Sequence, residues 1–145
     1  MFKSGLFSWQ FWAMLSAVFA ALTAIFGKIG VADVSADFAT LIRTVVILVA
    51  IAVLVFATGE WQPPATVGAR TWTFLVLSGL ATGASWLCYY RALKLGEASR
   101  VAPIDKLSVV LVALFAIVFL GERPAGIHLA GIALIAAGAV LVSLR

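Results

Sequence analysis

Residues Val101 to Arg123 read VAPIDKLSVVLVALFAIVFLGER, which places an adjacent aspartate and lysine at the head of a long apolar run. Between Lys106 and Glu122 the run has 15 uncharged residues, which make about 22 Å of α-helix. The hydrocarbon core of a bilayer is roughly 30 Å thick. If this run spans a membrane, its helix must therefore extend backwards through Asp105 and Lys106.

The composition of the whole chain supports a membrane location. Of its 145 residues, 64% are hydrophobic and only 11% are charged, and the mean hydropathy is +1.16. These values lie outside the range of soluble globular proteins. We therefore predict an all-α integral membrane protein that lies in, and contacts, the lipid bilayer.

Charge and cysteine content narrow the function classes further. The net charge is +4, but the basic residues are scattered and form no patch, so we expect no nucleic-acid partner. Cys88 is the single cysteine, so no disulfide or thiolate metal site can form within one chain. We expect no metal and no cofactor.

Charges and turn residues divide the chain into five apolar segments, each close to the roughly 20 residues that a spanning helix needs. The segment after Lys3 resembles a signal peptide, but its uncharged run from Ser4 to Gly27 is long enough to span the bilayer. We therefore predict one transmembrane domain over residues 1–145. Its spans cover approximately 9–29, 38–58, 70–94, 99–120 and 125–144.

Tryptophans and basic residues bear on the orientation. Trp9, Trp12, Trp61 and Trp72 fall on the N-terminal side of this threading, as interfacial residues do. The basic residues opposite the N-terminus are Lys28, Arg43, Arg91, Lys94, Arg100, Lys106 and Arg145, against Lys3, Arg70 and Arg123 on its side. Arg43, Arg91 and Lys106 of this set are placed within spans, and without them four basic residues stand against three. So nearly balanced a chain could insert in both directions, and two copies could pair as an inverted dimer.

Two interpretations of Asp105 and Lys106 are open. A helix that begins at Ser99 places both residues nearly two turns inside, where an ionisable residue indicates function. A helix that begins at Pro103 places Asp105 in the first turn, where it favours the positive helix end, and Lys106 reaches the interface.

Two arginines lie on the same side of the membrane as Asp105. Arg43, about a turn and a half into the second span, could form a charge pair with Asp105. Arg91 could compete for that partner, or it could extend to the interface beside Lys94.

The third span carries two polar or small-residue stripes at helical spacing. Ser78, Thr82, Ser85 and Tyr89 form one stripe, and Gly79, Gly83, Trp86 and Tyr90 form the other. Both could be helix contacts, or they could line a cavity for a small amphipathic solute. A similar small-residue face on the first span, made of Ser16, Ala20, Thr23 and Gly27, predicts helix packing.

The stretch GASWLCYYRALKLGEASRVAPIDKLSVVLVALFAIVFLGER, followed by GIALIAAGAVLV, resembles the EamA-type repeat of the drug/metabolite transporter superfamily. The turns from Ala92 to Gly96 and from Gly121 to Arg123 carry the likeness, which is closest to the small single-repeat members. Larger relatives have two inverted repeats around a central cavity. The resemblance therefore implies a homodimer, antiparallel in view of the balanced charge, or a heterodimer with a related half-transporter.

In this family, helices one, three and four line the cavity, so the resemblance directs the Ser85 and Tyr89 stripe and the Asp105–Lys106 pair towards it. We predict a secondary transporter in the inner (cytoplasmic) membrane that moves a small metabolite or amphipathic compound by alternating access as a dimer and couples to protons through Asp105. The candidate site residues are Asp105, Lys106, Arg43, Ser85, Trp86, Tyr89, Tyr90 and Arg91. The alternative is a non-transporting membrane subunit. An enzyme is not expected, because no catalytic set of residues is present, and no filter motif indicates a channel.

Overall fold

The computed structural model describes residues 8–144, and within them every regular element is helical. The elements are α1 (Trp9–Gly30), α2 (Ala36–Thr58), the short 3₁₀ helix η1 (Pro64–Thr66), α3 (Ala69–Leu95), α4 (Ala98–Asp105), α5 (Ser108–Leu120) and α6 (Gly126–Ser143). Five stretches are long and apolar enough to cross a membrane, with α4 and α5 together forming the fourth. The predicted all-α membrane fold is confirmed. The charges of Lys3 and Arg145 lie outside the described residues.

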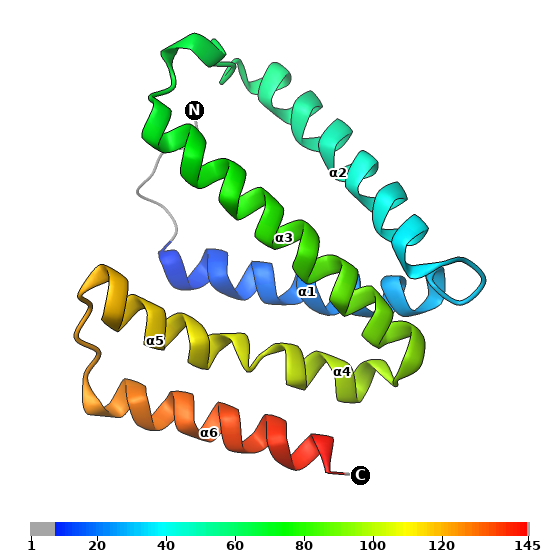
Figure 1. Ribbon diagram of the computed structural model, residues 1–145, viewed down its shortest axis with the longest axis vertical. Coiled ribbons are helices and arrows are strands. Elements are labelled where there is room, and N and C mark those ends of the chain that lie inside the picture. Colours follow the sequence, from blue (N-terminus) through cyan, green and yellow to red (C-terminus); the bar gives the residue numbers. More distant parts are fainter. Residues whose placement is uncertain (1–7, 145) are drawn as a thin grey trace. The chain divides into compact units, whose positions relative to one another are not determined.

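The chain forms two compact units, one that ends at Lys94 and one that begins at Leu95. In the first unit, α1, α2 and α3 meet near the 31–35 loop, and α1 diverges from α2 and α3 towards its N-terminal end (Figure 1). Local signals set the ends of α2. The Ser35 hydroxyl accepts a hydrogen bond from the Phe38 N–H at 3.2 Å, and Gly59 ends the helix in the left-handed conformation, with φ 68°.

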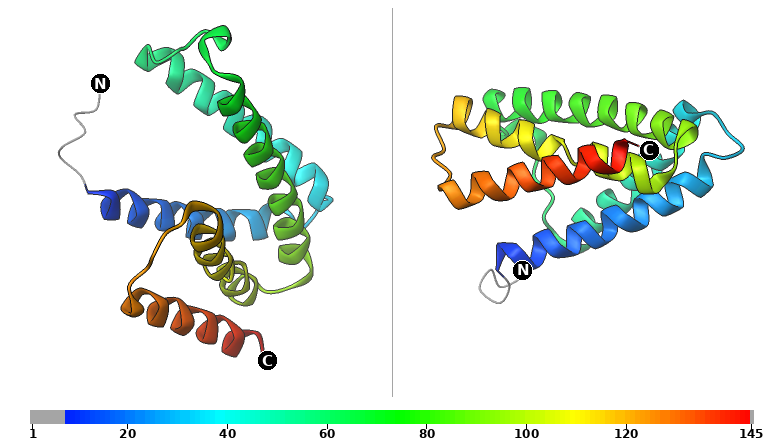
Figure 2. Two further views of the ribbon diagram at one scale, coloured as in Figure 1. Left: turned by 60° about the vertical axis from the view of Figure 1, so that its left-hand side comes forward. Right: turned by 90° about the horizontal axis from the view of Figure 1, so that it is seen from below.

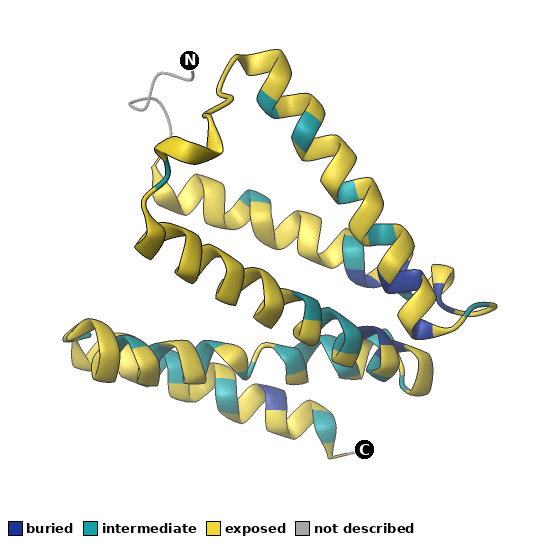
Figure 3. Cartoon of the chain, turned by 45° about the horizontal axis from the view of Figure 1, so that its top comes forward, coloured by how far each residue is buried: buried dark blue, intermediate teal, exposed yellow. Residues whose placement is uncertain are grey.

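The buried residues of the first unit gather where its helices meet (Figure 3). They are Ala24, Gly27, Val31, Ala36, Ala39, Thr40, Tyr90 and Leu93. Along the rest of these helices the large apolar side chains are exposed, for example Leu48 and Leu80. This distribution fits helices whose apolar surface faces lipid, because hydrocarbon covers apolar side chains without cost.

In the second unit, α6 runs beside α4 and α5, and α5 and α6 lie side by side in both views of Figure 2. Gly121, with φ 68°, makes the turn after α5, since residues with a side chain rarely adopt this conformation. The Arg100 guanidinium donates to the Ser143 carbonyl oxygen at 3.3 Å. This contact places a positive charge at the last turn of α6, where the helix end is partly negative.

The fourth span is present but its helix is interrupted, which the sequence did not predict. α4 ends at Asp105 and α5 begins at Ser108. Between them the hydrogen bonds shorten to the 3₁₀ pattern, from Leu107 N–H to Ile104 oxygen at 3.0 Å and from Val110 N–H to Leu107 oxygen at 3.0 Å. Pro103 lies inside α4 and cannot donate to the carbonyl one turn earlier, which weakens the helix before the break.

The start of α4 decides between the two sequence interpretations of Asp105. Because α4 begins at Ala98, Pro103 is not the first helical residue, and the interpretation that placed Asp105 in the first turn is wrong. Asp105 is instead the last residue of α4, two turns after its start. Lys106 follows as the C-terminal cap.

Candidate functional site

A pocket of about 470 Å³ lies within the first unit, near the end where its helices meet. Its walls are mostly apolar side chains and glycines from α1, α2, α3 and the 31–35 loop. They are Thr23, Phe26, Gly27, Gly30, Val34, Ala39, Ile42, Arg43, Val46 and Tyr90. Pockets of this size and composition can hold a small molecule.

Arg43 brings the only charge to the lining of this pocket. It is the eighth residue of α2, about 10 Å along the helix axis from its start. The carbon at the centre of its guanidinium lies 4.0 Å from the centre of the Trp86 ring and 5.4 Å from the centre of the Tyr90 ring. These are cation–π distances, so the two rings hold the guanidinium in place.

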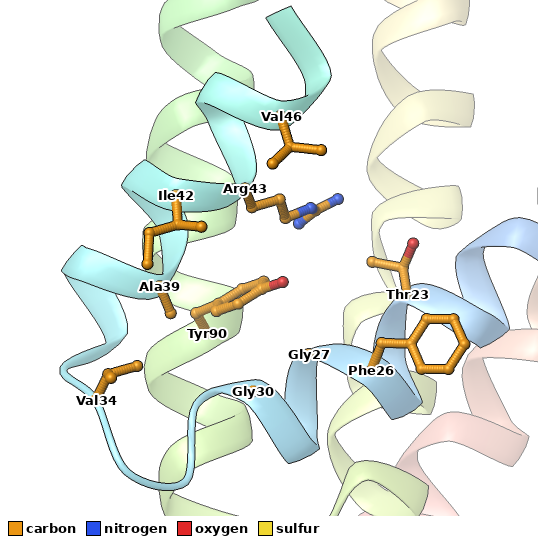
Figure 4. Close-up of a pocket in the computed structure, with 10 residues that line it drawn as sticks. All are labelled: Thr23, Phe26, Gly27, Gly30, Val34, Ala39, Ile42, Arg43, Val46 and Tyr90. Atoms are coloured by element: carbon orange, nitrogen blue, oxygen red, sulfur yellow. The ribbon is translucent and has the colours of Figure 1, made fainter. Parts of the chain in front are cut away.

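Three polar side chains line the pocket (Figure 4). The Arg43 guanidinium and the Tyr90 hydroxyl point towards α1, which contributes Thr23 to the same lining. The remaining walls offer apolar contact. This arrangement suits an amphipathic molecule, because its polar end can meet the three polar groups while its body contacts the walls.

Gly27 brings α1 close to α3 beside the pocket. A Cβ atom at Gly27 would lie 3.1 Å from the Tyr90 hydroxyl oxygen and 3.4 Å from a methyl carbon of Leu93. The absence of a side chain therefore lets Tyr90 reach its position. Packing through Gly27 agrees with the small-residue face predicted for the first span, although Ser16 and Ala20 of that face are exposed.

Three polar contacts fasten the helix ends around the 31–35 loop. Lys28 Nζ donates to the Leu93 carbonyl oxygen at 2.6 Å. Lys94 Nζ donates to the Val34 carbonyl oxygen at 2.6 Å.

The third contact is the ion pair between Arg91 and Asp37. Arg91 donates from Nε to Asp37 Oδ1 at 3.1 Å and from an Nη atom to Oδ2 at 3.0 Å. Both oxygens of the carboxylate are thus engaged in a bidentate pair. Arg91 therefore ties α3 to α2, which corrects the interpretation of this residue as a side chain that only extends to the interface.

Replacing Asp37 with asparagine is expected to lower the midpoint of thermal unfolding by about 2 °C at low salt. The effect is small because both side chains are exposed, and it should shrink at high salt, which screens the attraction. Asp33→Asn is the matched control, because Asp33 lies in the 31–35 loop just before α2 and forms no ion pair within residues 8–144. Equal midpoints for the two variants at low salt would contradict the role of the pair.

The structure brings together three of the predicted site residues: Arg43, Trp86 and Tyr90. Tyr89 packs edge-on against Tyr90, with ring centres 6.4 Å apart, while Ser85 is exposed and does not line the pocket. The Thr82 hydroxyl of the same stripe donates to the Ser78 carbonyl oxygen within α3. Of the two stripes on α3, the one that contains Trp86 and Tyr90 thus faces Arg43.

In the second unit, Asp105 and Lys106 form an ion pair with each other, with Nζ and Oδ2 3.1 Å apart. The pair stands where the fourth span is interrupted. A charge pair between Asp105 and Arg43 remains a prediction.

Asp37 and Thr23 were not predicted as site residues. Asp37 could have been suggested by its position, since it lies at the head of the second span on the same side of the membrane as Arg91. Thr23 was included in the packing face of the first span, and helical spacing alone cannot tell a packing hydroxyl from one that faces a pocket.

Comparison with known proteins places this architecture in a family. The EamA-like transporter family matches residues 7–144. A protein of Sinorhizobium sp, described as "Uncharacterized transporter in cobO 3'region", is 65% identical over 136 residues, which cover 94% of this chain and 96% of the relative. No solved structure matches the chain significantly. Five membrane spans and a match over nearly the whole chain lead to one conclusion: the protein is a multi-pass membrane protein that belongs to the EamA-like transporter family.

Proposed function

We propose that the protein is a secondary transporter of the inner (cytoplasmic) membrane, which moves a small amphipathic compound by alternating access as a dimer. The pocket around Arg43 carries this proposal, because it offers three polar groups and apolar walls within the spans of one unit. Membership in a transporter family supports the same function.

The number of spans and the distribution of charge support the proposed dimer. Residues 8–144 provide five candidate spans, an odd number, so two copies inserted in opposite directions would form an inverted pair. The nearly balanced basic residues favour such dual insertion. A related half-transporter of opposite orientation would serve the same purpose as a second copy.

Proton coupling is assigned to Asp105, with Lys106 as its partner. The pair lies at an interruption of a membrane span, and interrupted helices are common at the ion and substrate sites of secondary transporters. Protonation of Asp105 would leave the Lys106 ammonium without its counter-charge. The interruption then gives the span a point at which α4 and α5 can change their relative angle.

A flux assay tests the proposed function. The purified chain is reconstituted alone into liposomes that contain a pH-sensitive dye, and benzenesulfonate, phenylalanine and benzyltrimethylammonium are added in turn. Solute-dependent proton movement that is absent from empty liposomes is the expected result. Flux that appears only after a partner membrane protein is added would favour the non-transporting subunit instead.

Orientation tests the inverted dimer separately. A cytoplasm-active fluorescent reporter and a periplasm-active phosphatase are each fused after Arg145. Comparable activity of both reporters is expected for dual insertion. Activity of one reporter alone would rule out an inverted homodimer and direct the search to an oppositely oriented partner.

A further inference from the structure

The pocket of the first unit carries a positive charge without a matching negative one. Its lining contains Arg43 but no aspartate or glutamate. Within the described part of the first unit, residues 8–94, the Arg43 side chain forms no ion pair and no hydrogen bond, and its guanidinium lies over the Trp86 and Tyr90 rings. The Arg43 residue is partly buried.

The nearest carboxylate on the same helix is already engaged. Asp37 lies six residues before Arg43 on α2, and both of its oxygens accept hydrogen bonds from Arg91. In the second unit, the Asp105 carboxylate pairs with Lys106. Within the first unit, Asp37 thus has a basic partner of its own in Arg91 and is not available to Arg43.

The geometry of the ring contacts indicates which donors of Arg43 remain available. The guanidinium carbon lies over the Trp86 ring, 4.0 Å from its centre. A ring face accepts no hydrogen bond in the way that oxygen does, so the planar N–H donors can still pair with two oxygen atoms of a ligand. A charge without such a partner is costly in an apolar, membrane-spanning region.

We infer that this pocket binds the head of a small organic anion, a carboxylate, sulfonate or phosphate that carries an apolar body. The oxyanion pairs with Arg43, the Thr23 and Tyr90 hydroxyls add hydrogen bonds, and the apolar walls contact the body. The inference rests on the proposed transport function and names its substrate class. The volume of about 470 Å³ leaves room for a body of one or two rings.

A fluorescence titration at Trp86 tests the inference. The full-length chain, with phenylalanine in place of Trp9, Trp12, Trp61 and Trp72, is purified in neutral detergent. It is then titrated with benzenesulfonate, with the uncharged benzenesulfonamide and with the cationic benzylamine. We expect a saturable response to benzenesulfonate at a concentration about tenfold or more below that for either analogue. Equal responses to all three compounds would overturn the inference.

Variants assign the preference to Arg43. Arg43→Gln should remove the advantage of benzenesulfonate over benzenesulfonamide, while Arg43→Lys should keep part of it, because lysine keeps the charge but loses the planar donors. Arg70→Gln, at the far end of α3, removes the same charge away from the pocket and should change nothing. Unaltered discrimination in folded Arg43→Gln would overturn the inference. Should that variant fail to fold, the three-compound comparison in the parent protein decides alone.

Lipid head groups are a second source of oxyanions, and a further titration separates them from a soluble substrate. The benzenesulfonate response is measured in phosphatidylcholine nanodiscs with and without phosphatidylglycerol. An unchanged response supports a soluble anion, whereas loss of the response with phosphatidylglycerol would overturn the assignment to transported cargo. Binding without flux in the liposome assay would contradict the transport function but not the site, and flux without anion preference would contradict only the site.

Discussion

Replacing Gly27 with valine is expected to lower the midpoint of thermal unfolding by about 5 °C. Even the first carbon of a side chain would lie 3.1 Å from the hydroxyl oxygen of Tyr90 and 3.3 Å from its neighbouring ring carbon. Valine adds two more methyl groups at this crowded point. The Tyr90 ring must then move or α1 must separate from α3, and either change also disturbs the ring contacts of Arg43. Thermal unfolding of the purified protein in detergent gives the midpoint.

Gly30→Val is the matched control for this substitution. Gly30 lies on the same helix, and a Cβ atom there would have no other atom within 4 Å. Both variants introduce the same β-branched residue into α1, so the difference between their midpoints isolates the contact with α3. Midpoints that fall by the same amount would show that the close approach at Gly27 contributes nothing to stability.

Replacing Asp105 with asparagine is expected to abolish solute flux driven by a proton gradient while leaving exchange of solute for solute intact. Asparagine nearly keeps the shape of the side chain but cannot take up and release a proton. A purely structural role would reduce both kinds of flux together. Proteoliposomes with an imposed pH gradient measure the first kind of flux, and solute counterflow without a gradient measures the second.

Glu97→Gln is the control for the replacement of Asp105 with asparagine. Glu97 precedes the same helix as its N-terminal cap residue and makes no capping hydrogen bond through its side chain. Its replacement removes one acid from the start of α4 and leaves the Asp105–Lys106 pair unchanged, so both kinds of flux should persist. If gradient-driven flux survives in Asp105→Asn as well, Asp105 has no part in coupling.

The sequence predicted the features that depend on local patterns. Apolar runs between charges indicate spans because only about 20 apolar residues fit the bilayer core. The spacing of Trp86 and Tyr90 placed both rings on one side of the third span, because four residues make roughly one helical turn. These two residues do share the contact with Arg43.

The features that the sequence did not predict depend on how helices are rotated against each other. The contact of the Arg43 guanidinium with the Trp86 and Tyr90 rings is one such feature, because helical spacing does not show which side chains of α2 and α3 face each other. The Asp37–Arg91 pair joins residues 54 positions apart, which no periodicity reveals. The interruption after Asp105 was also not predicted, although Pro103 lies inside α4 just before it.

The contacts at the 31–35 loop make one end of the first unit a pivot. α1, α2 and α3 are joined there by Lys28, Lys94 and the Asp37–Arg91 pair, whereas the N-terminal end of α1 lies apart from α2 and α3 (Figure 1). α1 has 22 residues, so a tilt of about 10° at the pivot displaces its far end by about 6 Å. In the inverted dimer proposed above, the two pivots stand at opposite membrane surfaces. Each copy would then open on one side only, and two identical chains together would supply a gate for each side.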